Sequence, residues 1–178
     1  GWGVVTADAI TRDRDLELID LPEALRDRID ELLPPRWSRS NPVDLAGGET
    51  RDTIPRVLSM IAQDDGVDAV VYLGLGIQSN QARMLRNGPF GDDPDVARIV
   101  AYHERQDARF AQAAHDVSVA TGKPILTATE LAVADPTNAG PRTVRETGRI
   151  CYGSADRAVT ALGHLSRYAE HLRRRGLA

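Results

Sequence analysis

The segment DAVVYLGLG, residues 68–76, constrains the fold more than any other stretch, because it is almost wholly apolar over the length of one strand. A strand that is apolar on both faces is typical of a parallel sheet covered by helices on both sides. A clean amphipathic helix pattern precedes it, with apolar residues at i, i+3, i+4, i+7 and i+8: Ile54, Val57, Leu58, Ile61 and Ala62. Strands that alternate with such helices predict a parallel sheet with right-handed crossovers.

The rest of the chain extends this alternation. Strands are expected near residues 16–19, 43–45, 68–75, 124–128 and 149–152. Helices are expected over 4–10, 22–33, 54–62, 81–86, from about 96 to 121, and from 155 onward, with inward residues that include Ile99, Phe110, Leu165 and Tyr168. Gly122 and Ser154 are expected to cap the long helix and the last helix.

The opening Gly1-Trp2-Gly3 runs straight into a helical pattern, although a glycine-rich turn of this kind normally follows a strand. The predicted fold is therefore α/β: a flavodoxin-like, doubly wound parallel sheet in three αβα layers that lacks its first strand. No linker or repeat divides residues 1–178, so the sequence predicts a single domain. We expect this domain to be a piece of a longer chain.

Composition narrows the function classes. A formal charge of −4 gives no electrostatic basis for nucleic-acid binding, and no apolar run approaches a membrane span. The single cysteine, Cys151, cannot form a disulfide within the chain and fits a reducing compartment. These features predict a cytoplasmic domain with neither a nucleic-acid nor a membrane partner.

The segment NPVDLAGGETRDT, residues 41–53, leads from a short apolar stretch through two glycines into a helix start. Backbone N–H groups at a helix start stabilise an anion, and glycine lets the anion approach the backbone. The candidate phosphate-binding residues are Gly47, Gly48, Glu49 and Thr50. The alternative is that the glycines only turn the chain and Thr50 caps the helix, with Pro55 moving the helix start later.

Other candidate groups are weaker. The stretch after the strongest strand offers Gln78 to a ligand, although polar loop tips are usually solvated. His103, Glu104 and Asp107 have a spacing that could chelate a metal, but an exposed polar helix face explains them better. Cys151 is expected to be an inert core thiol, and the chain has no motif of a serine or cysteine nucleophile. No catalytic residue and no metal ligand is therefore assigned.

Several segments in order, among them GWGVVTADA, NPVDLAGGET, GVDAVVYLGLG and GKPILTATE, resemble the NDP-forming acyl-CoA synthetases, which include acetate–CoA ligase (ADP-forming) and succinyl-CoA synthetase. The resemblance is to their flavodoxin-like CoA-ligase domain. It implies a relay in which a phosphohistidine carries phosphate between an acyl phosphate and a nucleoside diphosphate. The helix start at Gly47, Gly48, Glu49 and Thr50 would help to hold the phosphohistidine. Supporting loops would contain Gly1, Gly3, Asn41, Asp44, Gly76 and Gln78.

The chain also departs from that family. It has no Ser-His-Thr-Gly loop, so none of His103, His115, His164 and His171 is assigned the phosphorylated role. The resemblance implies that the ATP-grasp, CoA-binding and phosphohistidine parts come from other domains or a subunit of the same synthetase. The whole enzyme would use CoA, ADP or ATP, and Mg²⁺, whereas this domain alone would bind no cofactor and be inactive.

A rival interpretation is a non-catalytic flavodoxin-like binding module, in which the polar insert of residues 79–95 carries a partner surface. Both interpretations allow the chain to form homo-oligomers.

Overall fold

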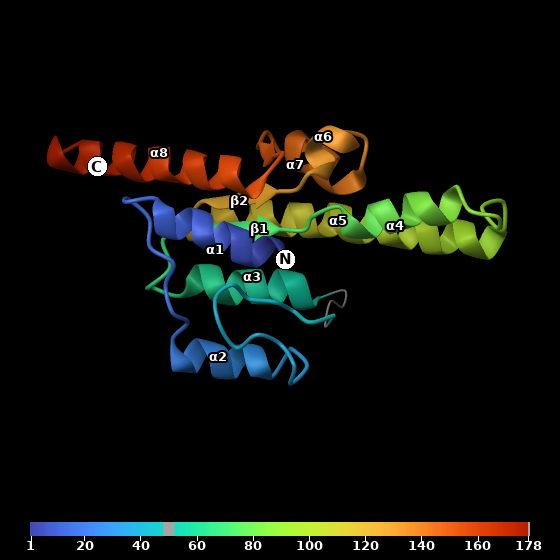
Figure 1. Cartoon of the computed structure of the whole chain (residues 1–178), viewed down its shortest axis with the longest axis horizontal. Helices are drawn as coiled ribbons and strands as arrows, with labels where there is room; N and C mark the ends of the chain where they lie inside the picture. The colour runs from blue at the N-terminus through green and yellow to red at the C-terminus, as the bar shows by residue number, and fades with distance from the viewer. Residues whose placement is uncertain (48–51, 178) are drawn as a thin grey trace.

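Three parallel strands run through the middle of the fold (Figure 1). They are β1 (Val70–Leu73), β2 (Ile125–Ala128) and β3 (Cys151–Tyr152), hydrogen-bonded in the order β1-β2-β3. Val70 lies opposite Ile125, and Thr127 lies opposite Cys151. This computed structural model describes residues 1–47 and 52–177 of the chain.

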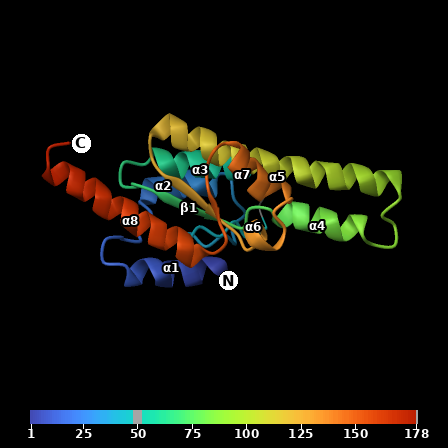
Figure 2. The same ribbon diagram turned by 90° about the horizontal axis from the view of Figure 1, so that it is seen from above.

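Helices cover both faces of the sheet. The described residues form eight of them: α1 (Trp2–Arg12), α2 (Glu23–Asp30), α3 (Thr53–Gln63), α4 (Ile77–Arg86), α5 (Pro94–Thr121), α6 (Leu131–Ala134), α7 (Ala139–Glu146) and α8 (Ala155–Arg174). Helices α3 and α5 pack on one face, and α2 packs on the outer side of α3. Helix α8 packs on the other face, with α1 alongside it (Figures 1 and 2). The predicted α/β class is confirmed, and the three layers are consistent with a flavodoxin-like αβα fold.

The strand residues alternate between two apolar clusters. Val70 and Tyr72 pack with Ile125 against α3 and α5, whereas Val71 and Leu73 pack toward α8. Because the side chains of a strand point alternately to opposite faces, a strand covered on both faces needs apolar residues throughout. This explains the uninterrupted apolar run of residues 69–73.

Two of the five predicted strands are absent from the described residues. Residues 16–20 and 43–45 have no assigned secondary structure and join no ladder. The first stretch is held by a side-chain hydrogen bond, from Asn41 Nδ2 to the carbonyl of Ile19 at 3.0 Å. An alternating apolar pattern favours extended backbone, but a strand also needs a neighbour to pair with, and within residues 1–47 and 52–177 β1 pairs with β2 alone.

Helix boundaries follow capping more closely than apolar spacing. Helix α3 begins at Thr53, so Pro55 falls in the first turn, where a backbone N–H has no helical partner. The start at Thr53 is one of the outcomes that Pro55 allows. Asp93 and Gly122 cap α5, and the Ser154 side chain accepts a hydrogen bond from the Arg157 amide at the start of α8.

The burial predictions for the two long helices are partly wrong. Phe110 is buried as expected, but Ile99, Leu165 and Tyr168 are exposed, because α5 and α8 extend beyond the sheet. Helices α6 and α7 were not predicted from apolar spacing. None of the described helices has both the length and the apolar character needed to cross a bilayer.

Candidate functional site

The candidate site lies at the edge of the sheet where the three strands end. Leu73 is followed by the turn into α4, Ala128 by the segment that leads to α6 and α7, and Tyr152 by the start of α8. In open parallel sheets this carboxyl edge is where ligands bind, since helix N-termini and connecting loops converge there.

The start of α1 touches two of the predicted supporting segments. A β-carbon added to Gly3 would lie 3.0 Å from Cβ of Pro42, so the helix and the loop of residues 41–47 are in close contact. A β-carbon added to Gly74 would lie 3.8 Å from the Trp2 ring. Gly3, which was predicted in a loop, therefore lies within α1 beside the loop of residues 41–47, whereas a β-carbon added to Gly1 would meet nothing within 4 Å.

Residues 38–47 form a loop that is ordered by short hydrogen bonds. The Ser38 hydroxyl donates to the Pro42 carbonyl at 2.9 Å and accepts from the Asp44 amide at 3.0 Å. The Asp44 carboxylate accepts from the Ala46 amide at 2.9 Å. Asp44 therefore shapes the path of the backbone toward Gly47, and it does so as an acceptor within the loop.

Gly47 is the one member of the predicted phosphate-binding group within the described residues; Gly48, Glu49 and Thr50 lie outside them. Its φ of 75° is in the left-handed region, which glycine adopts at no steric cost. A β-carbon added to Gly47 would lie 3.5 Å from Nη2 of Arg36. A guanidinium group beside this backbone is a suitable partner for an anion.

A second arginine, Arg109 of α5, lies beside the start of α3. The Asp52 carboxylate, directly before the first residue of α3, forms an ion pair with the Arg109 guanidinium of α5. Neither Arg36 nor Arg109 was a sequence candidate. Arg36 follows two prolines and comes just before the loop, so its position in the sequence could have indicated it as a candidate. Arg109 lies near the start of α3 because of tertiary packing, which the sequence does not show.

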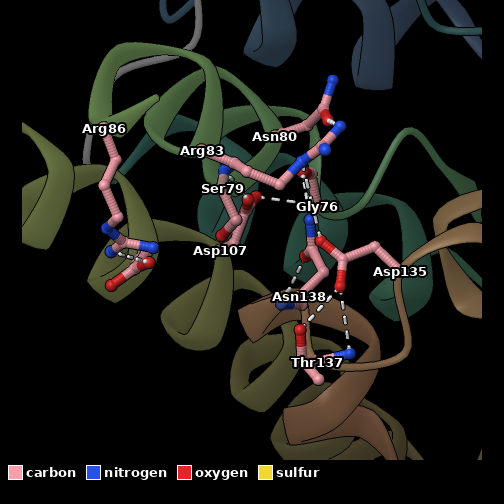
Figure 3. A network of polar contacts seen from close by, with 11 residues as sticks. Gly76, Ser79, Asn80, Arg83, Arg86, Asp107, Asp135, Thr137 and Asn138 are labelled. Carbon is pink, nitrogen blue, oxygen red and sulfur yellow. Dashed lines mark hydrogen bonds and ion pairs between the residues drawn. The ribbon is translucent and has the colours of Figure 1, made fainter. Parts of the chain in front are cut away.

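The turn after β1 is built around a buried carboxylate (Figure 3). Gly76 has a φ of 94°, and α4 begins at the next residue. The Asp107 side chain, from the middle of α5, accepts hydrogen bonds from the amide of Gly76 at 3.2 Å and of Ser79 at 2.5 Å. It thereby satisfies backbone donors at the N-terminus of α4, a function that a capping side chain usually performs from within its own helix.

Burial raises the pKa of the Asp107 carboxyl group above its ordinary value. The hydrogen bonds from Ser79 and Gly76 and the nearby His103 lower it, but they do not offset the desolvation of a side chain that is only 2% exposed. The exposed polar helix face favoured for His103, Glu104 and Asp107 is therefore wrong for Asp107, which is buried. Glu104 pairs with Arg86 at 2.6 Å, and no metal-binding cluster occurs within residues 1–47 and 52–177.

Asn138 ties α7 to the same turn. Its side-chain amide donates to the Gly76 carbonyl at 2.9 Å, and its side-chain oxygen accepts from the Gly140 amide at 3.0 Å. A β-carbon added to Gly140 would lie 2.9 Å from the Gly76 nitrogen, so the first turn of α7 touches the turn itself. Gly76 is thus a junction of β1, α4 and α7.

A polar pocket of about 260 Å³ opens beside this junction. Its lining includes three arginines, each with an acidic partner: Arg86 with Glu104, Arg83 with Asp135 at 3.9 Å, and Arg142 with Glu146 at 3.6 Å. These ion pairs compensate much of the positive charge of the pocket. In Figure 3, Asp135 lies beside Asn138, with Thr137 below it.

Gln78 is placed differently from the prediction. It lies in the first turn of α4 and not in a loop tip, and its side-chain oxygen is 3.3 Å from Nδ1 of His103. The helix starts four residues earlier than expected because Gly76 and Asp107 provide its cap.

The arrangement defines a class: an αβα domain with a parallel sheet, whose carboxyl edge gathers glycine turns, helix starts and an arginine. Residues 1–77 match the family model of the Ligase-CoA domain, and this match confirms the predicted relation to the CoA-ligase family. The matched part runs from α1 through β1 and contains the whole of residues 41–53. Searches of curated proteins and of solved structures give no match.

Proposed function

We propose that this chain is part of an NDP-forming acid–CoA ligase and that residues 47–50 help to hold a phosphohistidine supplied by another part of the enzyme. The reaction interconverts acyl-CoA, phosphate and NDP with acid, CoA and NTP. The observation that carries the proposal is the Ligase-CoA match, which includes the glycine-containing segment of residues 41–53.

The described geometry supports an anion at this position. The left-handed Gly47 leaves the backbone without a side chain, and the Arg36 guanidinium lies beside it. Helix α3 starts a few residues later, and its N-terminus contributes a partial positive charge. A phosphorylated imidazole presents a dianionic phosphoryl group, for which an arginine and backbone donors are a matched set. The other synthetase parts would supply the histidine, the CoA site and the nucleotide site.

Arg36→Gln in the assembled synthetase tests this proposal. We expect slower transfer between phosphohistidine and nucleoside diphosphate, by about 10- to 100-fold, because one charge-assisted contact is removed. The measurement is rapid-quench kinetics with radiolabelled nucleotide, which follows formation and decay of the phosphoenzyme directly.

Arg39→Gln is the matched control. Arg39 lies in the same loop, but its guanidinium pairs with Asp30 of α2. It should therefore leave phosphoryl transfer unchanged. Equal transfer rates in the Arg36→Gln variant, the Arg39→Gln variant and the unmodified enzyme would refute the proposed anion site.

A further inference from the structure

The α4–α5 hairpin projects beyond the rest of the molecule in two perpendicular views (Figures 1 and 2). It contains the polar insert of residues 79–95, which the proposed function does not use and which lies outside the Ligase-CoA match. Its two long sides differ in chemistry. One carries Arg83, Arg86 and Glu104 and borders the polar pocket.

The opposite side is apolar and exposed. Met84 and Leu85 of α4 are 65% and 41% exposed, and Ile99 and Tyr102 of α5 are 47% and 45% exposed. Met84 and Leu85 also line a shallow hollow of about 320 Å³ with His103, whose ring makes an edge contact with Tyr102. These five residues are called the hairpin face below.

Phe90, 73% exposed, extends this surface at the tip of the hairpin. With Phe90, the hairpin face exposes on the order of 500 Å², near the upper limit for the largest apolar patch of a monomer. A standard interface takes about 800 Å² from each partner, so this patch with a polar rim suits one protein–protein contact.

Acidic and basic residues lie at opposite ends of the hairpin face along α5. Asp92, Asp93 and Asp95 lie at the tip, and Arg105 lies on the same helix nearer the sheet. Asp95 and Arg105 are ten residues apart, and Ile99 and Tyr102 lie between them. Asp95 pairs with Arg98 of its own helix at 3.0 Å, but both side chains are more than 80% exposed, so Asp95 can exchange this partner for one on a second copy. When two such helices cross antiparallel near residue 100, Asp95 of each faces Arg105 of the other. An apolar centre with a charge pattern complementary to itself is what an isologous two-fold interface requires.

We propose that the hairpin face binds a second copy of this chain, with the two α4–α5 hairpins packed antiparallel as a four-helix bundle. Ile99 and Tyr102 of the two copies meet at the centre, and Asp95 of each copy pairs with Arg105 of the other. This proposal does not depend on the phosphohistidine role, because the hairpin lies apart from Gly47 and Arg36.

Sedimentation equilibrium of the 178-residue chain over a range of concentrations measures the association. We expect a dimer whose dissociation constant rises on the order of 30-fold or more in Tyr102→Glu, because a charge is placed at the apolar centre. Val119→Glu is the matched control: Val119 is an exposed apolar residue at the far end of α5, and its replacement should leave the dimer intact. Circular dichroism of both variants verifies that they are folded.

Charge reversal then tests the antiparallel arrangement. Asp95→Arg and Arg105→Asp should each weaken their own dimer, since both create two like-charge contacts. An equimolar mixture of the two variants should restore association, because each reversed residue then faces its complement.

Three results would overturn the proposal. These are a chain that stays monomeric at high concentration, a dimer that Tyr102→Glu leaves unchanged, and a mixture that associates no better than its components. A monomer whose Tyr102→Glu variant fails to bind the other synthetase parts would assign the hairpin face to those parts instead.

Discussion

Replacing Asp107 by alanine should destabilise the whole domain, because this carboxylate holds the turn after β1. Two buried backbone donors, the amides of Gly76 and Ser79, would lose their acceptor. Each unsatisfied donor costs about 1–3 kcal/mol, so a loss of about 2–4 kcal/mol is expected once some water reaches the site. A loss of this size is a large fraction of the 5–15 kcal/mol that typically holds a domain together.

Urea denaturation followed by circular dichroism measures this loss as a lower midpoint at unchanged slope. Asp116→Ala is the matched control, because Asp116 is on the same helix but exposed, and it accepts a hydrogen bond from the side chain of Gln112. Hydrogen exchange adds a local measurement: the Gly76 and Ser79 amides should exchange faster in the Asp107→Ala variant than in the control. A midpoint for Asp107→Ala equal to that of the Asp116→Ala control would refute the capping role.

Asp107→Asn separates the charge of this side chain from its hydrogen bonds. The amide keeps one acceptor and removes the cost of burying an ionised group, so it should destabilise less than alanine. The pKa of Asp107 is raised in the folded chain, so the folded state binds more protons than the unfolded state between the two pKa values. The stability of the unmodified chain should therefore fall as pH rises from about 3.9 through the folded pKa. The Asp107→Asn variant should lack this slope, and identical profiles would contradict the direction of the shift.

Three further results are expected. Gly140→Ala should cost about 1–3 kcal/mol in urea denaturation, because its β-carbon would lie 2.9 Å from the Gly76 nitrogen and from Cγ of Leu75; an unchanged midpoint would show that α7 can move away. Burial raises the pKa of the Cys151 thiol, so at neutral pH a thiol reagent should label it at least about tenfold more slowly in the folded chain than in urea. Equal labelling rates would show that the thiol is accessible and ionises normally. Asp52→Asn should lower stability by at most about 1 kcal/mol, because its ion pair with Arg109 is largely exposed; a larger loss would give this pair a structural role.

The parts of the fold that the sequence predicts well are those whose cause is local or repetitive. Residues 69–73 are apolar throughout because both faces of β1 are covered, and the sequence alone shows this continuous apolar run. The cap of α8 at Ser154 and the left-handed Gly122 after α5 are likewise local, since each acts within a few residues of its own position. These features could be predicted without knowledge of the tertiary structure.

The parts that escaped prediction depend on partners distant in sequence. The start of α4 is set by Asp107, a residue 31 positions after Gly76, so a pattern around Gln78 indicates a polar loop and not a capped helix. In the sequence, Asp107 has the pattern of an exposed residue on a polar helix face, because none of its sequence neighbours indicates that its carboxylate is buried. Arg109 near the start of α3 is a similar case, since its partner Asp52 lies 57 positions before it.

The predicted strands at residues 16–19 and 43–45 show the opposite case, in which the local pattern is present but the strand does not form. Their alternating residues suit an extended backbone, but pairing is a property of the sheet, and a stretch without a neighbour stays a loop. The loss of a strand at 43–45 still leaves the site in place, because the Ser38 hydroxyl and the Asp44 carboxylate order the same backbone with three side-chain hydrogen bonds. The path toward Gly47 is thus fixed by polar side chains within the loop, so the glycine-rich segment can be positioned at the carboxyl edge of the sheet without being the end of a strand.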